Sequence, residues 1–143
     1  MGLKVLVKTG PGTKNRRVAI RKMAETVLKG LGYSDCEVSI FLTGDSGIRE
    51  LNRKYRNKDK PTDVLSFPMN DPYMLGDVVI SVERAGAQAE SFEVTVDEEL
   101  GRLITHGILH LIGYDHVNGG RQARKMRERE TELMGVLKKS GLA

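Results

Sequence analysis

Two short segments in the N-terminal half carry the hydrophobic pattern of β-strands. Val38, Ile40 and Leu42 recur at every second position, which places them on one buried face of a strand. An apolar stretch at residues 3–7 predicts an earlier strand, because a Gly-Pro-Gly turn follows it at residues 10–12.

Apolar residues repeat at helical spacing between these strands and again after the second one. The first helix is predicted from about Asn15 to Gly30, and its apolar positions are Ile20, Met23, Ala24, Val27, Leu28 and Leu31. Asp45 is expected to cap a shorter helix, in which Ile48, Leu51 and Tyr55 face inward. The polar stretch at residues 56–61 predicts a loop.

The C-terminal half contains two more strand patterns and three helix patterns. Strands are predicted at residues 64–67 and 77–81, joined by a loop with two prolines. Ser81 can cap a helix to about residue 89, and Thr95 with Glu98 forms a capping box for the next helix. Gly113 ends that helix, and a last helix is expected at about residues 119–138. We therefore predict one α+β domain, residues 1–143, with a small mixed sheet of about four strands packed against helices.

The composition is that of a globular protein, with 39% apolar and 29% charged residues. No run of about 18 apolar residues predicts a membrane span, and the N-terminal stretch is too short and too basic for a signal peptide. Cys36 is the only cysteine, so an internal disulfide is excluded and a small buried apolar role is expected. We expect a reducing, cytoplasmic location and no membrane partner.

The charge is unevenly distributed along the chain. Residues 1–60 carry 14 Lys and Arg against 6 Asp and Glu, whereas residues 61–143 carry 9 against 13. A basic half can attract a polyanion such as RNA. Charge alone still favours a simple solvated surface over a binding site.

All three histidines of the chain fall in the segment HGILHLIGYDH, residues 106–116. His106 and His110 are four residues apart on a predicted helix, so their imidazoles lie on one face, one turn apart. Gly113 lets the chain turn, and His116 can then return as a third ligand. Three protein ligands leave a fourth position open for water, which is the arrangement of a catalytic metal site. Imidazole ligands favour zinc, with nickel, copper and iron as alternatives.

The histidine spacing matches the metzincin protease signature H-E-x-x-H-x-x-G-x-x-H with one difference. Gly107 stands where those proteases carry the glutamate that acts as general base. Asp115 is a candidate for that base or for orienting a ligand histidine, and a plain turn residue is an equal alternative. Hydrolysis of a substrate with a better leaving group than a peptide is therefore favoured, with a metalloprotease as the alternative.

The chain resembles the YbeY family of bacterial rRNA-maturation endoribonucleases in three segments. These are LNRKYRNKDKPTDVLSFP from residue 51, LGDVVIS from residue 75, and the histidine segment. The resemblance implies a metal ion, Zn2+ or another transition metal such as Ni2+, on His106, His110 and His116. It also implies cleavage of single-stranded RNA, maturation of the 3′ end of small-subunit rRNA, ribosome quality control with ribosomal partners, and an important arginine, here Arg56.

A physical role for Arg56 follows from phosphodiester chemistry. A guanidinium can hold the non-bridging oxygens of a phosphate with two hydrogen bonds, and Lys58 would add a point charge for RNA. Asp63, Ser66 and Asp77 are expected to be structural. The nucleophile is either metal-activated water or the RNA 2′-hydroxyl, and a non-catalytic ribosome-associated factor with a structural metal is a further alternative.

Overall fold

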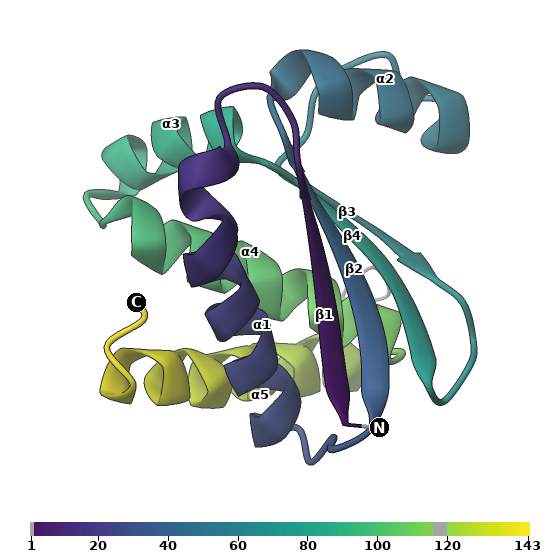
Figure 1. Cartoon of the computed structure of the whole chain (residues 1–143), viewed down its shortest axis with the longest axis vertical. Helices are drawn as coiled ribbons and strands as arrows, with labels where there is room; N and C mark the ends of the chain where they lie inside the picture. Colours follow the sequence, from purple (N-terminus) through teal and green to yellow (C-terminus); the bar gives the residue numbers. More distant parts are fainter. Residues whose placement is uncertain (1, 116–119) are drawn as a thin grey trace.

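The computed structural model describes residues 2–115 and 120–143. The described part begins with strand β1 (Leu3–Thr9), a 3-10 turn η1 (Lys14–Arg16) and helix α1 (Arg17–Gly30) (Figure 1). Next come β2 (Cys36–Thr43), α2 (Asp45–Arg56), β3 (Val64–Pro68) and β4 (Met74–Ser81). Three helices complete it, α3 (Val82–Phe92), α4 (Val96–Leu111) and α5 (Gly120–Lys139).

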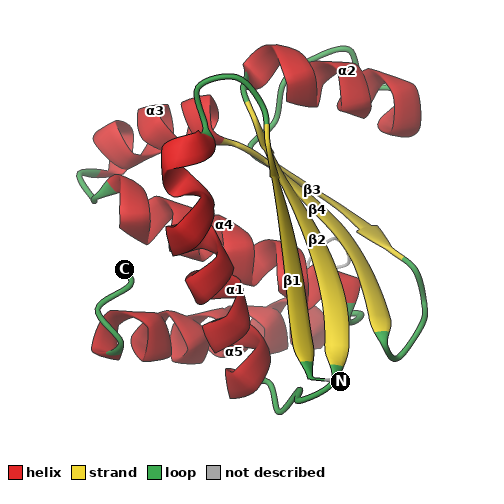
Figure 2. Ribbon diagram, in the orientation of Figure 1, coloured by secondary structure: helices red, strands yellow, loops and turns green. Residues whose placement is uncertain are grey.

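The four strands form one mixed sheet in the order β1-β2-β4-β3 (Figure 2). β1, β2 and β4 are parallel, whereas β3 runs antiparallel to β4 and forms an edge of the sheet. The predicted α+β fold with a small mixed sheet is therefore confirmed. One of the two prolines expected in the loop between the last two strands, Pro68, is instead the last residue of β3.

The main hydrophobic core lies between one face of the sheet and helices α1, α4 and α5. Alternate strand residues point into it, and their burial provides most of the driving force for this packing, at about 1.5–3 kcal/mol for each large side chain. The fully buried side chains of this core include Ile20, Leu28, Ile40, Leu42, Ile80, Leu103, Ile104 and Ile108. Because α4 is buried on most sides, it holds a fixed position against β3 and β4.

Helix α2 makes a smaller contact, beside the opposite face of the sheet (Figure 1). Its residue Ile48 joins Leu65 and Val79 in a second, small cluster of buried residues. Tyr55 faces the sheet as predicted, since its ring meets Phe67 of β3, but it is 55% exposed and so does not join the core.

The capping predictions were confirmed at two helices and wrong at one. Ser81 Oγ accepts the Arg84 N–H at 3.1 Å at the start of α3, and Thr95 Oγ1 accepts the Glu98 N–H at 3.0 Å at the start of α4. Asp45 is instead the first residue of α2, preceded by Gly44 as N-cap. Its carboxylate accepts the hydroxyl of Ser81 at 2.8 Å, so it ties α2 to the end of β4.

The remaining predictions concern helix ends, the cysteine and the membrane. Gly113 follows α4 with φ of 103°, a left-handed conformation that glycine adopts without strain. Cys36 is a buried free thiol, as expected. None of the helices in the described part of the chain has the length and the apolar character that a membrane crossing requires.

Candidate functional site

Two of the three histidines lie side by side on α4 and face a common pocket. The ring centroids of His106 and His110 are 4.7 Å apart, with an angle of 71° between the ring planes. Both residues line a pocket of about 650 Å³, together with Arg56, residues 62–66 and residues 113–115. The predicted pairing of these imidazoles on one helix face is therefore present in the structure.

Gly107 explains how α4 brings the histidines so close to the sheet. A Cβ atom at this position would lie 2.7 Å from Cγ1 of Val78, a buried residue of β4. The Gly107 carbonyl oxygen also accepts the Ser66 hydroxyl of β3 at 2.9 Å. A glutamate at position 107 would force α4 away from the sheet, so this backbone excludes the residue that proteases use as a base.

Glu130 of α5 contacts the first histidine of the pocket. Its Oε1 atom lies 3.2 Å from Nδ1 of His106, where an ionised carboxylate accepts an Nδ1–H. Such a contact fixes the orientation of an imidazole and directs Nε2 to a metal ion. Sequence reasoning missed this residue, because 24 positions and a turn separate it from His106.

Arg56 is the last residue of α2, and its side chain lines the pocket. Its Nη2 donates to the Ser66 carbonyl oxygen at 2.7 Å, and its Cζ lies 4.9 Å from the centre of the Phe67 ring. The predicted arginine therefore shares one cavity with the histidines and is held by the edge strand. Lys58 is exposed in the following loop and is not among the described residues that line the pocket.

The pocket also contains polar residues that the sequence had assigned to structural roles. Ser66 and Asp63 line it, and both have structural contacts as well. The Asp63 carboxylate accepts the Val64 N–H at 2.8 Å and lies 3.7 Å from an Arg102 nitrogen. Asp115, which the sequence left open between a base, an orienting residue and a turn residue, also lies on the pocket wall. All three lie in segments through which the chain resembles a known family, and that was the signal in the sequence that could have marked them as pocket residues.

The structure describes two of the three predicted metal ligands. His116 lies outside the described residues, and within residues 2–115 and 120–143 no group of three or more His, Cys, Asp or Glu side chains is arranged to hold a metal ion. The two described imidazoles nevertheless suit the expected metal ion, because they share one face of α4 and one cavity. The complete ligand set stays a prediction.

The fold and the pocket define a class of protein. It is an α+β protein that presents paired imidazoles, a guanidinium and carboxylates to one cavity, where they suit a metal ion and a phosphate ester.

A family model described as Endoribonuclease YbeY matches residues 9–138, and the chain belongs to this family. A relative named endoribonuclease YbeY from Aquifex aeolicus is 48% identical over 141 residues, which cover 96% of this chain and 93% of the relative. Another of that name from Geobacter metallireducens is 46% identical over 131 residues, covering 86% and 87%. The solution structure of TM1509 from Thermotoga maritima matches with a TM-score of 0.68 and 31% identity, covering 96% of this chain and 90% of that one.

Proposed function

We propose that residues 1–143 form a single metal-dependent endoribonuclease domain that cleaves single-stranded RNA. The observation that carries this proposal is the placement of His106, His110 and Arg56 around one pocket in a chain of the endoribonuclease YbeY family. Paired imidazoles supply metal ligands, and the guanidinium supplies a partner for a phosphate.

The metal-binding residues in this proposal are His106, His110 and His116, with zinc as the ion. A zinc ion held by these residues would lower the pKa of a water molecule and polarise the phosphate. Glu130 holds the His106 ring through Nδ1 at 3.2 Å. Asp115 lines the pocket, and in this proposal its carboxylate either accepts a proton there or orients a ligand histidine.

Arg56 binds the non-bridging oxygens of the scissile phosphate. A guanidinium has five N–H donors, and the hydrogen bond to the Ser66 carbonyl oxygen leaves the others for the phosphate. Since that bond and the Phe67 ring already orient the side chain, little ordering is required when charge develops in the transition state. Lys58 contacts RNA outside the pocket, as an exposed point charge.

The proposed substrate is a precursor of small-subunit rRNA, cleaved near its 3′ end, in the cytoplasm and with ribosomal partners. The basic balance of residues 1–60, 14 Lys and Arg against 6 Asp and Glu, supports a polyanionic substrate. A part in ribosome quality control belongs to the same proposal.

The test combines elemental analysis with cleavage assays on single-stranded RNA, duplex RNA and unstructured casein. We expect about one zinc ion per chain in the purified protein and cleavage of the single strand alone. His110→Ala should lose both metal and cleavage. Arg56→Ala should keep the metal and cleave about 10²–10³-fold more slowly, as for the loss of a transition-state donor, while Arg17→Ala at the exposed start of α1 should behave as the wild type.

Three results would contradict the proposal. Casein cleavage without RNA cleavage would establish a protease, and RNA cleavage that survives in His110→Ala would exclude the histidine pocket. A wild-type protein that never cleaves rRNA precursors, with an unfolded His110→Ala variant, would indicate a ribosome-associated factor with a structural metal. The end groups of the products distinguish the nucleophiles, because attack by the 2′-hydroxyl leaves a cyclic phosphate.

A further inference from the structure

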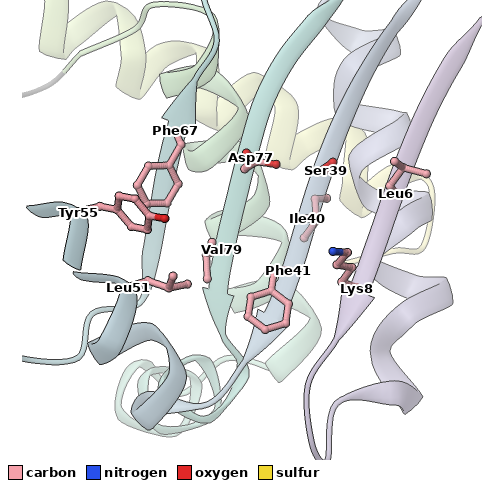
Figure 3. A pocket seen from close by; sticks show the side chains of 10 residues that line it. All are labelled: Leu6, Lys8, Ser39, Ile40, Phe41, Leu51, Tyr55, Phe67, Asp77 and Val79. Atoms are coloured by element: carbon pink, nitrogen blue, oxygen red, sulfur yellow. The ribbon is translucent and has the colours of Figure 1, made fainter. Parts of the chain in front are cut away.

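The sheet face opposite the main core forms a second cavity, a groove of about 570 Å³ beside α2 (Figure 3). It is lined chiefly by Leu6, Lys8, Phe41, Tyr55, Phe67 and Asp77. Strand pairing places Leu6, Ser39, Asp77 and Phe67 in one row across the four strands. In the described part of the chain, helix α2 is the element that flanks this face.

Aromatic rings remain exposed in this groove. Tyr55 is 55% exposed, and its ring meets the Phe67 ring edge-on, with centroids 5.5 Å apart and planes at 68°. Phe67 and Phe41 are both half-buried, so each presents part of its ring to the solvent. Phe41 and Phe67 pack against the small cluster around Ile48 on one side, and the parts of the rings left exposed offer stacking surfaces.

Cationic side chains surround the aromatic rings. Lys54 Nζ lies 5.2 Å from the centre of the Tyr55 ring, and Arg56 Cζ lies 4.9 Å from that of Phe67. Lys8 is exposed on β1, in register with Phe41 of β2. Aromatic stacking surfaces flanked by positive charges are the features by which proteins bind single-stranded nucleic acids.

The groove and the histidine pocket lie on opposite faces of the edge strand β3. Successive side chains of a strand point to opposite faces, so Phe67 lines the groove while Ser66 lines the pocket. Arg56 contacts both, because it donates to the Ser66 carbonyl oxygen and lies over the Phe67 ring. An RNA strand that lies in the groove therefore passes the edge of the sheet at Arg56.

We propose that this groove binds the bases of the single-stranded RNA that flank the scissile phosphate. The inference rests on the proposed endoribonuclease activity and adds the path of the substrate. Bases stack on Tyr55 and the neighbouring phenylalanines, with phosphates toward Lys8 and Lys54. The Asp77 carboxylate in the groove accepts hydrogen bonds from exocyclic amino groups of the bases, which favours adenine over uracil.

The test measures the affinity of the protein for a fluorescent 2′-O-methyl oligoadenylate of about eight nucleotides. A matched strand with the same phosphates and abasic sugars reports charge alone. We expect Tyr55→Ala to weaken oligoadenylate binding about fivefold or more, the equivalent of about 1 kcal/mol for one stacked base. Tyr55→Phe should stay within about twofold, and neither variant should alter binding of the abasic strand.

Control variants separate stacking from general effects on the surface. Phe92 in α3 is 57% exposed, so Phe92→Ala removes an aromatic ring of similar exposure outside the groove and should leave binding unchanged. Lys8→Ala should weaken the binding of both the oligoadenylate and the abasic oligonucleotide. It should also reduce the slope of log affinity against log salt by about 0.7, the value for one phosphate contact. Lys22→Ala on α1 should not change that slope.

The results distinguish this inference from the proposed activity. Equal binding by Tyr55→Ala and wild type, while the wild type cleaves RNA, would overturn the groove and leave the endoribonuclease standing. Loss of groove binding in Tyr55→Ala, with no RNA cleavage by the wild type, would support the groove and refute the activity. A change in the sedimentation of free Tyr55→Ala, with oligoadenylate affinity unchanged, would show that the groove is an interface between two copies of the chain.

Discussion

The close contact between α4 and β4 can be tested at Gly107. A Cβ added there would meet Cγ1 of Val78 at 2.7 Å, and Val78 is a buried, β-branched residue whose side chain has little freedom to move. Forcing an extra methyl group into a packed core costs about 1–3 kcal/mol. Alanine is also better than glycine within a helix by about 1 kcal/mol, so the net cost of Gly107→Ala is about 0–2 kcal/mol.

Gly135 in α5 provides the matched control. Apart from the backbone of α5 itself and its two chain neighbours, no atom of residues 2–115 and 120–143 lies within 4 Å of a Cβ built at Gly135, so Gly135→Ala should show the helical gain alone, about 1 kcal/mol of added stability. The gain in helix propensity cancels between the two variants. Their free energies of unfolding should therefore differ by about 1–3 kcal/mol, in favour of Gly135→Ala.

Urea denaturation measures this difference from the midpoints of the two transitions, provided that the slopes agree. A second comparison uses Val78→Ala as background, where the penalty of Gly107→Ala should shrink because the contacting methyl groups are gone. We expect a coupling energy of about 0.5–3 kcal/mol between the two positions. If Gly107→Ala raises the midpoint as much as Gly135→Ala does, α4 is not pressed against β4 and the position derived for the histidines is wrong.

Three further predictions concern the surroundings of the site. Glu130→Gln should lower metal affinity about 10–100-fold in competition with a chelator, since Glu130 orients His106, and unchanged affinity would exclude that role. Burial raises the pKa of the Cys36 thiol, so iodoacetamide at neutral pH should react faster with urea-unfolded than with folded protein, and equal rates would contradict this. Asn52→Ala should cost about 1–3 kcal/mol, because the buried amide donates to the Lys60 carbonyl oxygen at 2.8 Å. Limited proteolysis should then cut the loop at residues 57–62 faster, and an unchanged cleavage rate would count against the bond.

Local interactions explain why many elements could be predicted from the chain alone. Thr95 caps α4 because its hydroxyl oxygen accepts an N–H three residues away, and no distant residue is required. The pairing of His106 and His110 follows from the pitch of one helix. The strand at residues 38–42 was recognisable since its alternate residues are buried.

Other features depend on contacts between distant parts of the chain. Tyr55 has the helical spacing of an inward residue and meets Phe67 of β3, yet it is 55% exposed because it borders the open groove rather than the small cluster around Ile48. Glu130 meets His106 only after α5 folds back along α4. Asp63 and Ser66 reach the pocket because β3 lies at the sheet edge beneath α4.

The amino-acid order alone therefore sets the helix and strand patterns, the caps of α3 and α4, and two imidazoles on one helical face, since these depend on neighbours a few residues apart. Packing of α4 against the sheet and α5 decides the partners of those imidazoles, and the position of α2 beside the other face decides the arginine held by Ser66 and the open aromatic groove. The physical reason is that a residue's neighbours across a sheet or a helix interface are chosen by burial of the whole core, which no short stretch of sequence encodes.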